Sequence, residues 1–138
     1  MNATNIYKVD KMYTVFVYGT LKKGFGNNIL LENSLYLGTG KVINYALKYS
    51  HGDNGFPVMF KRKNNIVYGE LYAVDNYVLS SLDDLEGEGT LYHRKKVRVI
   101  TDTETLPAYT YIGSNFWKLK ELTDVGKKEH NWNGKINA

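Results

Sequence analysis

The fold is decided by residues 75–87, which read DNYVLSSLDDLEG. Asp75 is suited to cap a helix, because its carboxylate can accept hydrogen bonds from the unpaired N–H groups of the first turn. Gly87 is suited to end that helix, because glycine adopts the left-handed conformation at little cost. We therefore expect a helix over residues 76–86. Strand-like segments flank this helix on both sides, and the pattern indicates an α+β domain built on a curved mixed sheet.

The predicted strands are rich in β-branched and aromatic residues and are bounded by turn residues. They cover residues 12–17, 35–49, 56–60, 65–74, 92–100 and 106–112, with a bend or bulge in the second and turns at residues 51–55 and 61–64. Short helices are expected at residues 28–32, where Asn27 or Asn28 can act as the cap, and around residues 116–122. The periodicity of the strands leaves open whether the sheet closes into a barrel.

The composition is that of a chain that can fold as one domain without disulfide bonds or a bound metal. Its 138 residues are 43% hydrophobic, and a chain of this length buries enough surface for one core. We assign the domain to residues 12–126, with a polar extension at residues 1–11 and a loose polar tail at residues 127–138. Cysteine is absent, which excludes disulfides, zinc-thiolate sites and cysteine nucleophiles. Apolar stretches are too short to span a membrane and the first residues are too polar for a signal peptide, so we expect a cytoplasmic protein with no membrane partner.

The net charge of +4 does not indicate a nucleic-acid partner. The excess of lysine lies near the two ends of the chain, whereas a protein that follows phosphates concentrates its basic residues on one face of the folded body. The nearest candidate cluster is Arg94-Lys95-Lys96 with Arg98, and a solvated strand face explains it equally well. We therefore expect no nucleic-acid partner.

Glu86 is the candidate catalytic residue. One side of the predicted helix carries residues at the i, i+4, i+7 and i+8 spacing, namely Val78, Leu82, Leu85 and Glu86. Glu86 therefore shares the side that faces the core, whereas Asp84 points toward water. Burial and the negative end of the helix dipole both disfavour the ionised carboxylate and raise its pKa, which suits general acid and base catalysis. The alternative, a glutamate at a frayed helix end that turns to water, is left open by the spacing.

The turn after the first predicted strand is the candidate substrate-binding segment. It consists of Tyr18, Gly19, Thr20 and Leu21. Because Gly19 has no side chain, a ligand can approach the backbone, and successive N–H groups can turn toward an anion or a carbonyl. A tight connection after a buried strand explains the same four residues without any ligand.

Two other kinds of site find no support in the sequence. Gly19 and Gly24 have the spacing of a phosphate-binding loop, but the required Lys followed by Ser or Thr is missing after the second glycine. The three histidines, His51, His93 and His130, lack the spacing of metal ligands, and no cysteine is available to join them. We therefore expect no nucleotide, no metal and no other cofactor.

Several segments together resemble the γ-glutamyl cyclotransferase-like superfamily, and most of all its γ-glutamylamine cyclotransferase and AIG2-like branch. They are VFVYGTL at residues 15–21, VYGELYAV at residues 67–74, LDDLEG at residues 82–87 and LYHR at residues 91–94. The resemblance covers about residues 13–113. It implies a small mixed β-barrel-like sheet with flanking helices, a pocket at the turn of residues 18–21 and a catalytic role for Glu86.

The activity that the resemblance implies is cyclisation of a γ-glutamyl amine to 5-oxoproline with release of the free amine. The substrate's own α-amine attacks its γ-carbonyl while Glu86 moves the protons, so neither an enzyme nucleophile nor a cofactor is needed. Tyr92 and Arg94 are expected to order the segment after Gly87, and Tyr111 is a candidate for the pocket wall or for the core. A tailoring enzyme of biosynthesis and a catalytically silent binding module on the same scaffold are the alternatives. The sequence leaves the oligomeric state and the leaving amine open.

Overall fold

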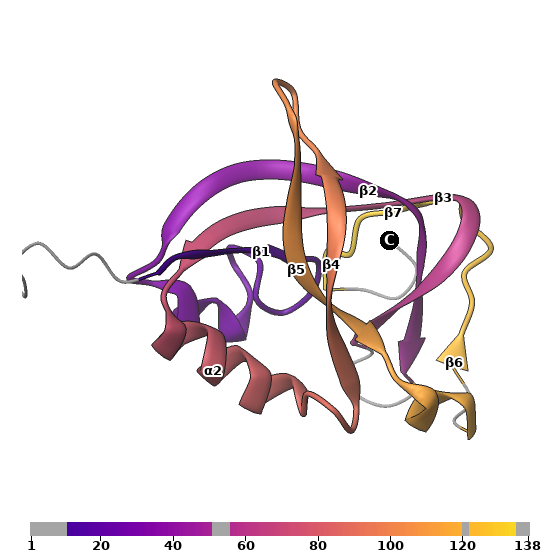
Figure 1. Ribbon diagram of the computed structural model, residues 1–138. Helices are drawn as coiled ribbons and strands as arrows, with labels where there is room; N and C mark the ends of the chain where they lie inside the picture. The colour runs from indigo at the N-terminus through magenta and orange to yellow at the C-terminus, as the bar shows by residue number, and fades with distance from the viewer. Residues whose placement is uncertain (1–10, 51–55, 120–121, 135–138) are drawn as a thin grey trace, which may run out of the picture.

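The chain is built around one strongly curved sheet, with helix α2 beside it (Figure 1). The computed structural model describes residues 11–50, 56–119 and 122–134. Its strands are β1 (Tyr13–Val17), β2 (Leu35–Ser50), β3 (Pro57–Val74), β4 (Tyr92–Ile100), β5 (Thr105–Gly113), β6 (Leu122–Thr123) and β7 (Glu129–His130). Its helical segments are α2 (Asn76–Glu86) and the 3-10 helices η1 (Gly26–Leu31) and η2 (Asn115–Leu119). The predicted turn at residues 51–55 lies outside the described residues.

The sheet closes on itself, a point that the strand pattern leaves open. Its strands follow the order β6-β2-β4-β5-β1-β3-β7, and β2 also pairs with β3, so that β2, β4, β5, β1 and β3 form a ring. Strand β1 pairs parallel with β5 and antiparallel with β3, which makes the sheet mixed. The predicted α+β class, with a small, mixed, barrel-like sheet and flanking helices, is therefore confirmed.

Strand β1 joins the barrel to the helix because successive side chains of a strand point to opposite faces. Val15 and Val17 pack in one buried cluster with Leu79 and Leu82 of α2. Phe16, between them, packs in a second cluster with residues of the other barrel strands. The end of β1 is thus fixed from both sides, and the turn that follows it starts from a rigid position.

Helix α2 has the predicted bounds and both predicted caps. The Asp75 carboxylate accepts a hydrogen bond of 2.8 Å from the Val78 N–H, and Gly87 has the left-handed angles φ 59° and ψ 52°. The predicted inward face is wrong in one place, because Leu79 is buried while Leu85 is 40% exposed. The helix is rotated slightly about its axis relative to the predicted stripe, so that Leu79 and Leu82 carry its contact with β1.

The long pair of β2 and β3 confirms the predicted bulges and corrects one predicted turn. The register shifts between Tyr36 and Gly38 and again after Ile43. Residues 61–64, predicted as a turn between two strands, are instead part of the single strand β3. Asn44 and Asn64 both have positive φ, and the Asn64 N–H donates to Asn44 Oδ1 at 3.1 Å. Asparagine tolerates this conformation, so the ladder bulges here without ending.

The short helix η1 is present, but its predicted caps are wrong. Phe25 is the residue before it, and no side chain caps it. The side-chain amide of Asn27 donates to Thr20 Oγ1, and that of Asn28 donates to the Leu21 carbonyl, both at 2.8 Å. These two side chains therefore tie η1 to the turn of residues 18–21.

Residues 129–132 are more ordered than the polar composition of this part of the sequence predicts. Glu129–His130 form β7 and pair with β3, His130 is 2% exposed, and Trp132 is 5% exposed. The loose tail expected beyond residue 126 is therefore wrong for residues 129–132, because β7 and Trp132 belong to the packed body. Among the described residues, no helix has the length and apolar character needed to cross a membrane.

Candidate active site

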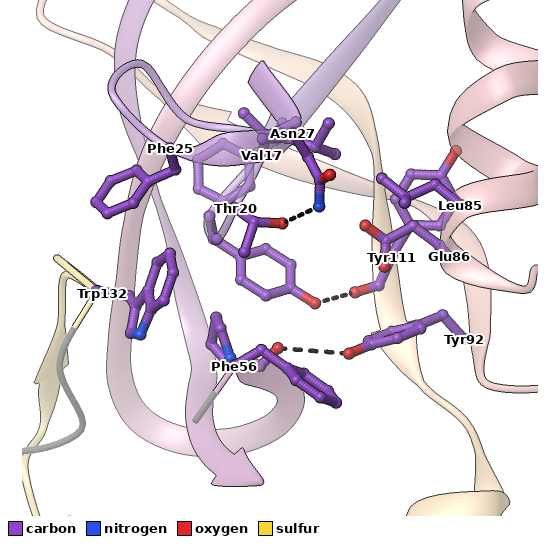
Figure 2. A pocket seen from close by; sticks show the side chains of 16 residues that line it. Val17, Thr20, Phe25, Asn27, Phe56, Leu85, Glu86, Tyr92, Tyr111 and Trp132 are labelled. Carbon is purple, nitrogen blue, oxygen red and sulfur yellow. Dashed lines mark hydrogen bonds between the residues drawn. The ribbon is translucent and has the colours of Figure 1, made fainter. Parts of the chain in front are cut away.

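The last turn of α2 and the turn after β1 open onto one cavity of about 530 Å³. Figure 2 shows Glu86, Tyr92 and Tyr111 on one side of this cavity, Phe25 and Trp132 on the other, and Thr20 between them. The lining consists of Phe16, Val17, Tyr18, Gly19, Thr20, Leu21, Phe25, Asn27, Phe56, Pro57, Leu85, Glu86, Tyr92, Tyr111, Trp132 and Gly134. Glu86 and all four residues of the predicted binding turn are thus brought together, and Tyr111 joins them.

Glu86 lies at the cavity with its side chain partly buried and does not turn out to water. Burial raises the pKa of this carboxyl from an ordinary value of 4.5 to about 7. No described residue forms a hydrogen bond with the carboxyl group. No hydrogen bond therefore offsets the cost of removing the carboxylate from water. Near neutral pH both the protonated and the ionised forms of Glu86 are populated.

Three tyrosines surround Glu86, and each directs its hydroxyl elsewhere. Tyr18 donates to the Tyr111 carbonyl at 2.6 Å, Tyr111 donates to Asp83 Oδ1 at 2.7 Å, and Tyr92 donates to the Pro57 carbonyl at 3.4 Å. Burial is the main cause that raises the pKa of each hydroxyl far above its usual range. Nearby negative charge or a neighbouring phenol raises it further. All three stay neutral near pH 7, so Glu86 is the group of this wall that changes its protonation state there.

Asp83 lies one turn before Glu86 and also faces the body of the protein, which the helical spacing did not predict. Its carboxylate accepts the Tyr111 hydroxyl and forms an ion pair with Arg94, with Nη1 and Oδ2 2.5 Å apart. The Arg94 N–H also donates to Glu88 Oε2 at 3.3 Å. Arg94 therefore orders the segment after Gly87, as the sequence predicted, and Asp83 fixes the Tyr111 ring beside Glu86.

The turn of residues 18–21 is closed by the Lys22 N–H, which donates to the Gly19 carbonyl at 2.9 Å. A Cβ atom at Gly19 would lie 3.0 Å from Pro57 Cγ, whereas the φ of Gly19 is not positive. A side chain at this position would crowd Pro57, so glycine here provides space rather than an unusual backbone conformation. The N–H groups of Gly19, Thr20 and Leu21 donate to no other described residue, so they are available to a ligand in the cavity.

The two described histidines, His93 and His130, stand apart from this cavity. His93 is exposed on β4, and His130 is buried against Asn65 with 3.1 Å between Nε2 and Oδ1. His51 lies outside the described residues. Within residues 11–50, 56–119 and 122–134, no group of three or more His, Asp or Glu side chains is placed to hold a metal ion.

Sequence reasoning missed Trp132 and Phe25. Trp132 reaches the cavity from the segment after β7, and its ring lies against the Phe25 ring with centroids 4.8 Å apart. A lone tryptophan in a polar segment was the available signal, since a large apolar ring is seldom left in a loose tail.

Solved structures described as a gamma-glutamyl cyclotransferase and as an AIG2-like protein share the fold of this chain. The chain belongs to the family described as gamma-glutamyl cyclotransferase, AIG2-like, whose model matches residues 15–134. Its relatives include a protein of Methanocaldococcus jannaschii described as a candidate gamma-glutamylcyclotransferase, 41% identical over 72% of this chain and 83% of that protein. A gamma-glutamylcyclotransferase family protein of Citrobacter rodentium is 38% identical over 61% of this chain and 70% of that protein.

Solved structures share the fold. The crystal structure of an AIG2-like protein from Mus musculus has a TM-score of 0.67 and 24% identity, covering 84% of this chain and 90% of the mouse chain. An uncharacterized protein of Pyrococcus horikoshii has a TM-score of 0.56 and 27% identity, covering 73% of this chain and 77% of that chain. The family establishes the general class of enzyme, and the substrate has to be argued from the cavity.

Proposed function

We propose that this protein converts γ-glutamyl amines into 5-oxoproline and a free amine, with Glu86 as general base and general acid. The observation that carries the proposal is that Glu86, with a pKa of about 7, and the turn of residues 18–21 line one cavity. A partly protonated carboxyl beside backbone donors suits a reaction that moves protons at one end of a substrate and holds polar groups at the other.

The reaction is an intramolecular acyl transfer. Ionised Glu86 removes a proton from the substrate's α-ammonium group, and the resulting amine attacks the γ-carbonyl carbon, which forms the new C–N bond of the lactam. The tetrahedral intermediate then expels the original amide nitrogen, which takes the proton from Glu86 and leaves as the free amine. The new lactam nitrogen gives up its second proton to Glu86, which is ionised again at this point, and Glu86 passes this proton to the released amine, which departs as an ammonium ion. The nucleophile belongs to the substrate, so the proposed mechanism needs no covalent intermediate and no cofactor.

The turn of residues 18–21 is assigned to binding of the γ-glutamyl group. Its N–H groups can hold the α-carboxylate of the substrate or the oxygen that becomes negative in the tetrahedral intermediate. Tyr18 carries the turn through its hydrogen bond to Tyr111, and Leu21 anchors it in the core. The substrate is thereby held in the folded conformation from which its amine reaches its own carbonyl.

Replacement of Glu86 by Gln tests the proposal. The amide keeps the size of the side chain but cannot exchange protons, so release of 5-oxoproline from a panel of γ-glutamyl amines should fall by about 100-fold or more. The matched control is Asp84→Asn, which makes the same chemical change at an exposed position of the same helix and should keep activity within about twofold.

The outcomes separate the candidate functions. Undiminished turnover in Glu86→Gln would remove Glu86 from the mechanism. Wild-type protein that binds γ-glutamyl amines yet never releases 5-oxoproline would instead indicate a silent binding module on this scaffold.

A further inference from the structure

The end of the cavity opposite Glu86 is an aromatic wall made of Phe25 and Trp132 (Figure 2). The planes of the two rings are inclined by 36° and their centroids are 4.8 Å apart. Phe25 precedes η1 near the start of the chain, whereas Trp132 follows β7 near its end. The wall therefore exists only because residues 131–132 lie beside Lys22, directly after the turn of residues 18–21.

Three contacts hold this aromatic wall in place. The Lys22 ammonium donates to the Trp132 carbonyl at 2.5 Å and to Asn131 Oδ1 at 3.1 Å. Gly134 has φ +96°, and a Cβ atom there would lie 3.1 Å from Phe25 Cε1, so the backbone passes close to the Phe25 ring. Because both sides of the wall are fixed, its shape is preorganised for a ligand.

One polar atom of Trp132 lowers the stability of the fold, which is unexpected for a residue that serves folding alone. Its Nε1 atom is buried and has no hydrogen-bond partner among the described residues. Leaving a buried donor unpaired costs stability, and such groups in native proteins often mark function. The position of the indole ring is better explained by the surface that it offers to the cavity.

The charges around the aromatic wall restrict what can bind there. Among the described lining residues, Glu86 is the only side chain that carries a charge near neutral pH, because the tyrosines stay neutral and no lysine or arginine takes part. Lys22 lies behind the wall, where it is 7% exposed and bonded to Trp132 and Asn131. The Lys22 ammonium lies 5.9 Å from the centroid of the Phe25 ring, but it is held by Trp132 and Asn131 and does not line the cavity. A leaving amine with a carboxylate would therefore find no cation among the lining residues, and one with a second ammonium would find no carboxylate beyond Glu86.

We infer that Phe25 and Trp132 form a subsite for the amine that leaves, and that this subsite selects amines with an uncharged aromatic or apolar substituent. The inference rests on the proposed function. The γ-carbonyl must lie beside Glu86 and the glutamyl backbone at the turn of residues 18–21, which leaves the aromatic wall for the rest of the substrate. A flat substituent can pack against the parts of the two rings that line the cavity.

A matched substrate series tests this subsite. Wild-type protein should show a kcat/KM for γ-glutamylbenzylamine at least roughly tenfold above that for γ-glutamylmethylamine, since the benzyl group buries more apolar surface. It should also process γ-glutamylglycine, whose leaving group carries a carboxylate, more slowly than γ-glutamylbenzylamine. Trp132→Ala should lower the preference for benzyl over methyl by roughly tenfold, whereas Trp132→Phe should keep most of it. Tyr77→Ala, which removes an 81% exposed aromatic ring from α2, is the control and should leave the preference unchanged.

A binding measurement separates the subsite from catalysis. Calorimetric titration of Glu86→Gln with γ-glutamylbenzylamine and γ-glutamylmethylamine, with and without Trp132→Ala, should show the same difference in Kd without turnover. If Trp132→Ala fails to fold, Phe25→Leu serves in its place and should reduce the benzyl preference severalfold. Equal benzyl and methyl values in wild-type protein, or a preference untouched by both aromatic variants, would overturn the subsite. Absence of 5-oxoproline from every substrate would overturn the proposed function instead.

Discussion

Glu86 occupies a position that costs folding stability, and the proposed function gives this position a chemical purpose. Its carboxyl is placed at the last position of α2, faces a cavity and receives no hydrogen bond from a described residue. The ionised form is therefore less stable in the folded protein than in the unfolded chain. Helical spacing predicted this placement, because Glu86 is eight residues from Val78 and four from Leu82 on a regular helix.

The raised pKa of Glu86 makes the stability of the protein depend on pH. Below pH 4.5 the carboxyl is protonated in both states and has no effect, whereas between pH 4.5 and about 7 the unfolded chain loses the proton that the folded protein retains. Raising the pH through this window thus favours unfolding. Glu86→Gln, which is neutral throughout, should be more stable than wild type above pH 7, by an amount on the order of 3 kcal/mol, and equal to it near pH 4.

Urea unfolding at pH 4 and pH 8 measures this difference. Glu104→Gln, in the exposed loop between β4 and β5, makes the same change outside the cavity and should show no such dependence. A constant difference between Glu86→Gln and wild type at both pH values would contradict a buried, protonated Glu86.

The contact between Asp83 and Tyr111 could not be predicted from residue spacing. The spacing along α2 did not predict that Asp83 faces the body of the protein, and it does not identify the partners of Asp83. Tyr111 and Arg94 come from β5 and β4, and their contact with Asp83 depends on how the barrel docks against the helix. Three neutral tyrosines around one carboxyl are likewise a product of the assembled site.

Helix α2 was predicted in full because its signals are local. The cap at Asp75, the apolar spacing and the left-handed Gly87 all act within a few residues of one another. The helix fixes Glu86 through its own rigidity and through the packing of Leu79 and Leu82 on β1.

Loss of the N-cap should weaken α2 measurably. Asp75→Ala removes the hydrogen bond to the Val78 N–H and should reduce the free energy of unfolding by about 1 kcal/mol. Asn76→Ala, at the neighbouring exposed position, should change it by less than about 0.5 kcal/mol. Urea titrations of both variants test the comparison, and equal midpoints for Asp75→Ala and Asn76→Ala would show that the cap contributes nothing.

Strand β3 shows where local signals mislead. Residues 61–64 are charged and polar, as turns often are, yet they continue an exposed part of the strand. The partner strand β2 absorbs the irregularity through Asn44, whose side chain accepts from the Asn64 N–H. Composition alone does not distinguish a polar bulge from a turn, because both expose their side chains to water.

The packed body is completed by contacts between segments that lie far apart in the sequence. Strand β7 adds to the outer edge of β3, His130 is buried beside Asn65, and Trp132 completes the cavity. The packed body therefore reaches beyond residue 126, where the polar composition placed the end of the domain.

A chain that ends at residue 126 should show the contribution of this final segment. It loses the burial of Trp132 and the pairing of β7, so its free energy of unfolding should fall by at least about 2 kcal/mol. The same truncation should lower kcat/KM for γ-glutamyl amines, since one side of the cavity is removed. Urea midpoints and activities equal to those of the full chain would show that residues 127–138 are dispensable.

The sequence by itself determined the α+β class, the position of α2 with its caps, the strands β1, β4 and β5, and the presence of Glu86 on the inward side of a helix. These features depend on dihedral preferences, caps and side-chain periodicity, which act between residues close together in the chain. Only the tertiary structure decided that the sheet closes, that Asp83 holds Tyr111, and that Trp132 meets Phe25. Each of these contacts joins segments far apart in the chain, so it forms only when the free energy of packing the entire barrel offsets the entropy of bringing those segments together.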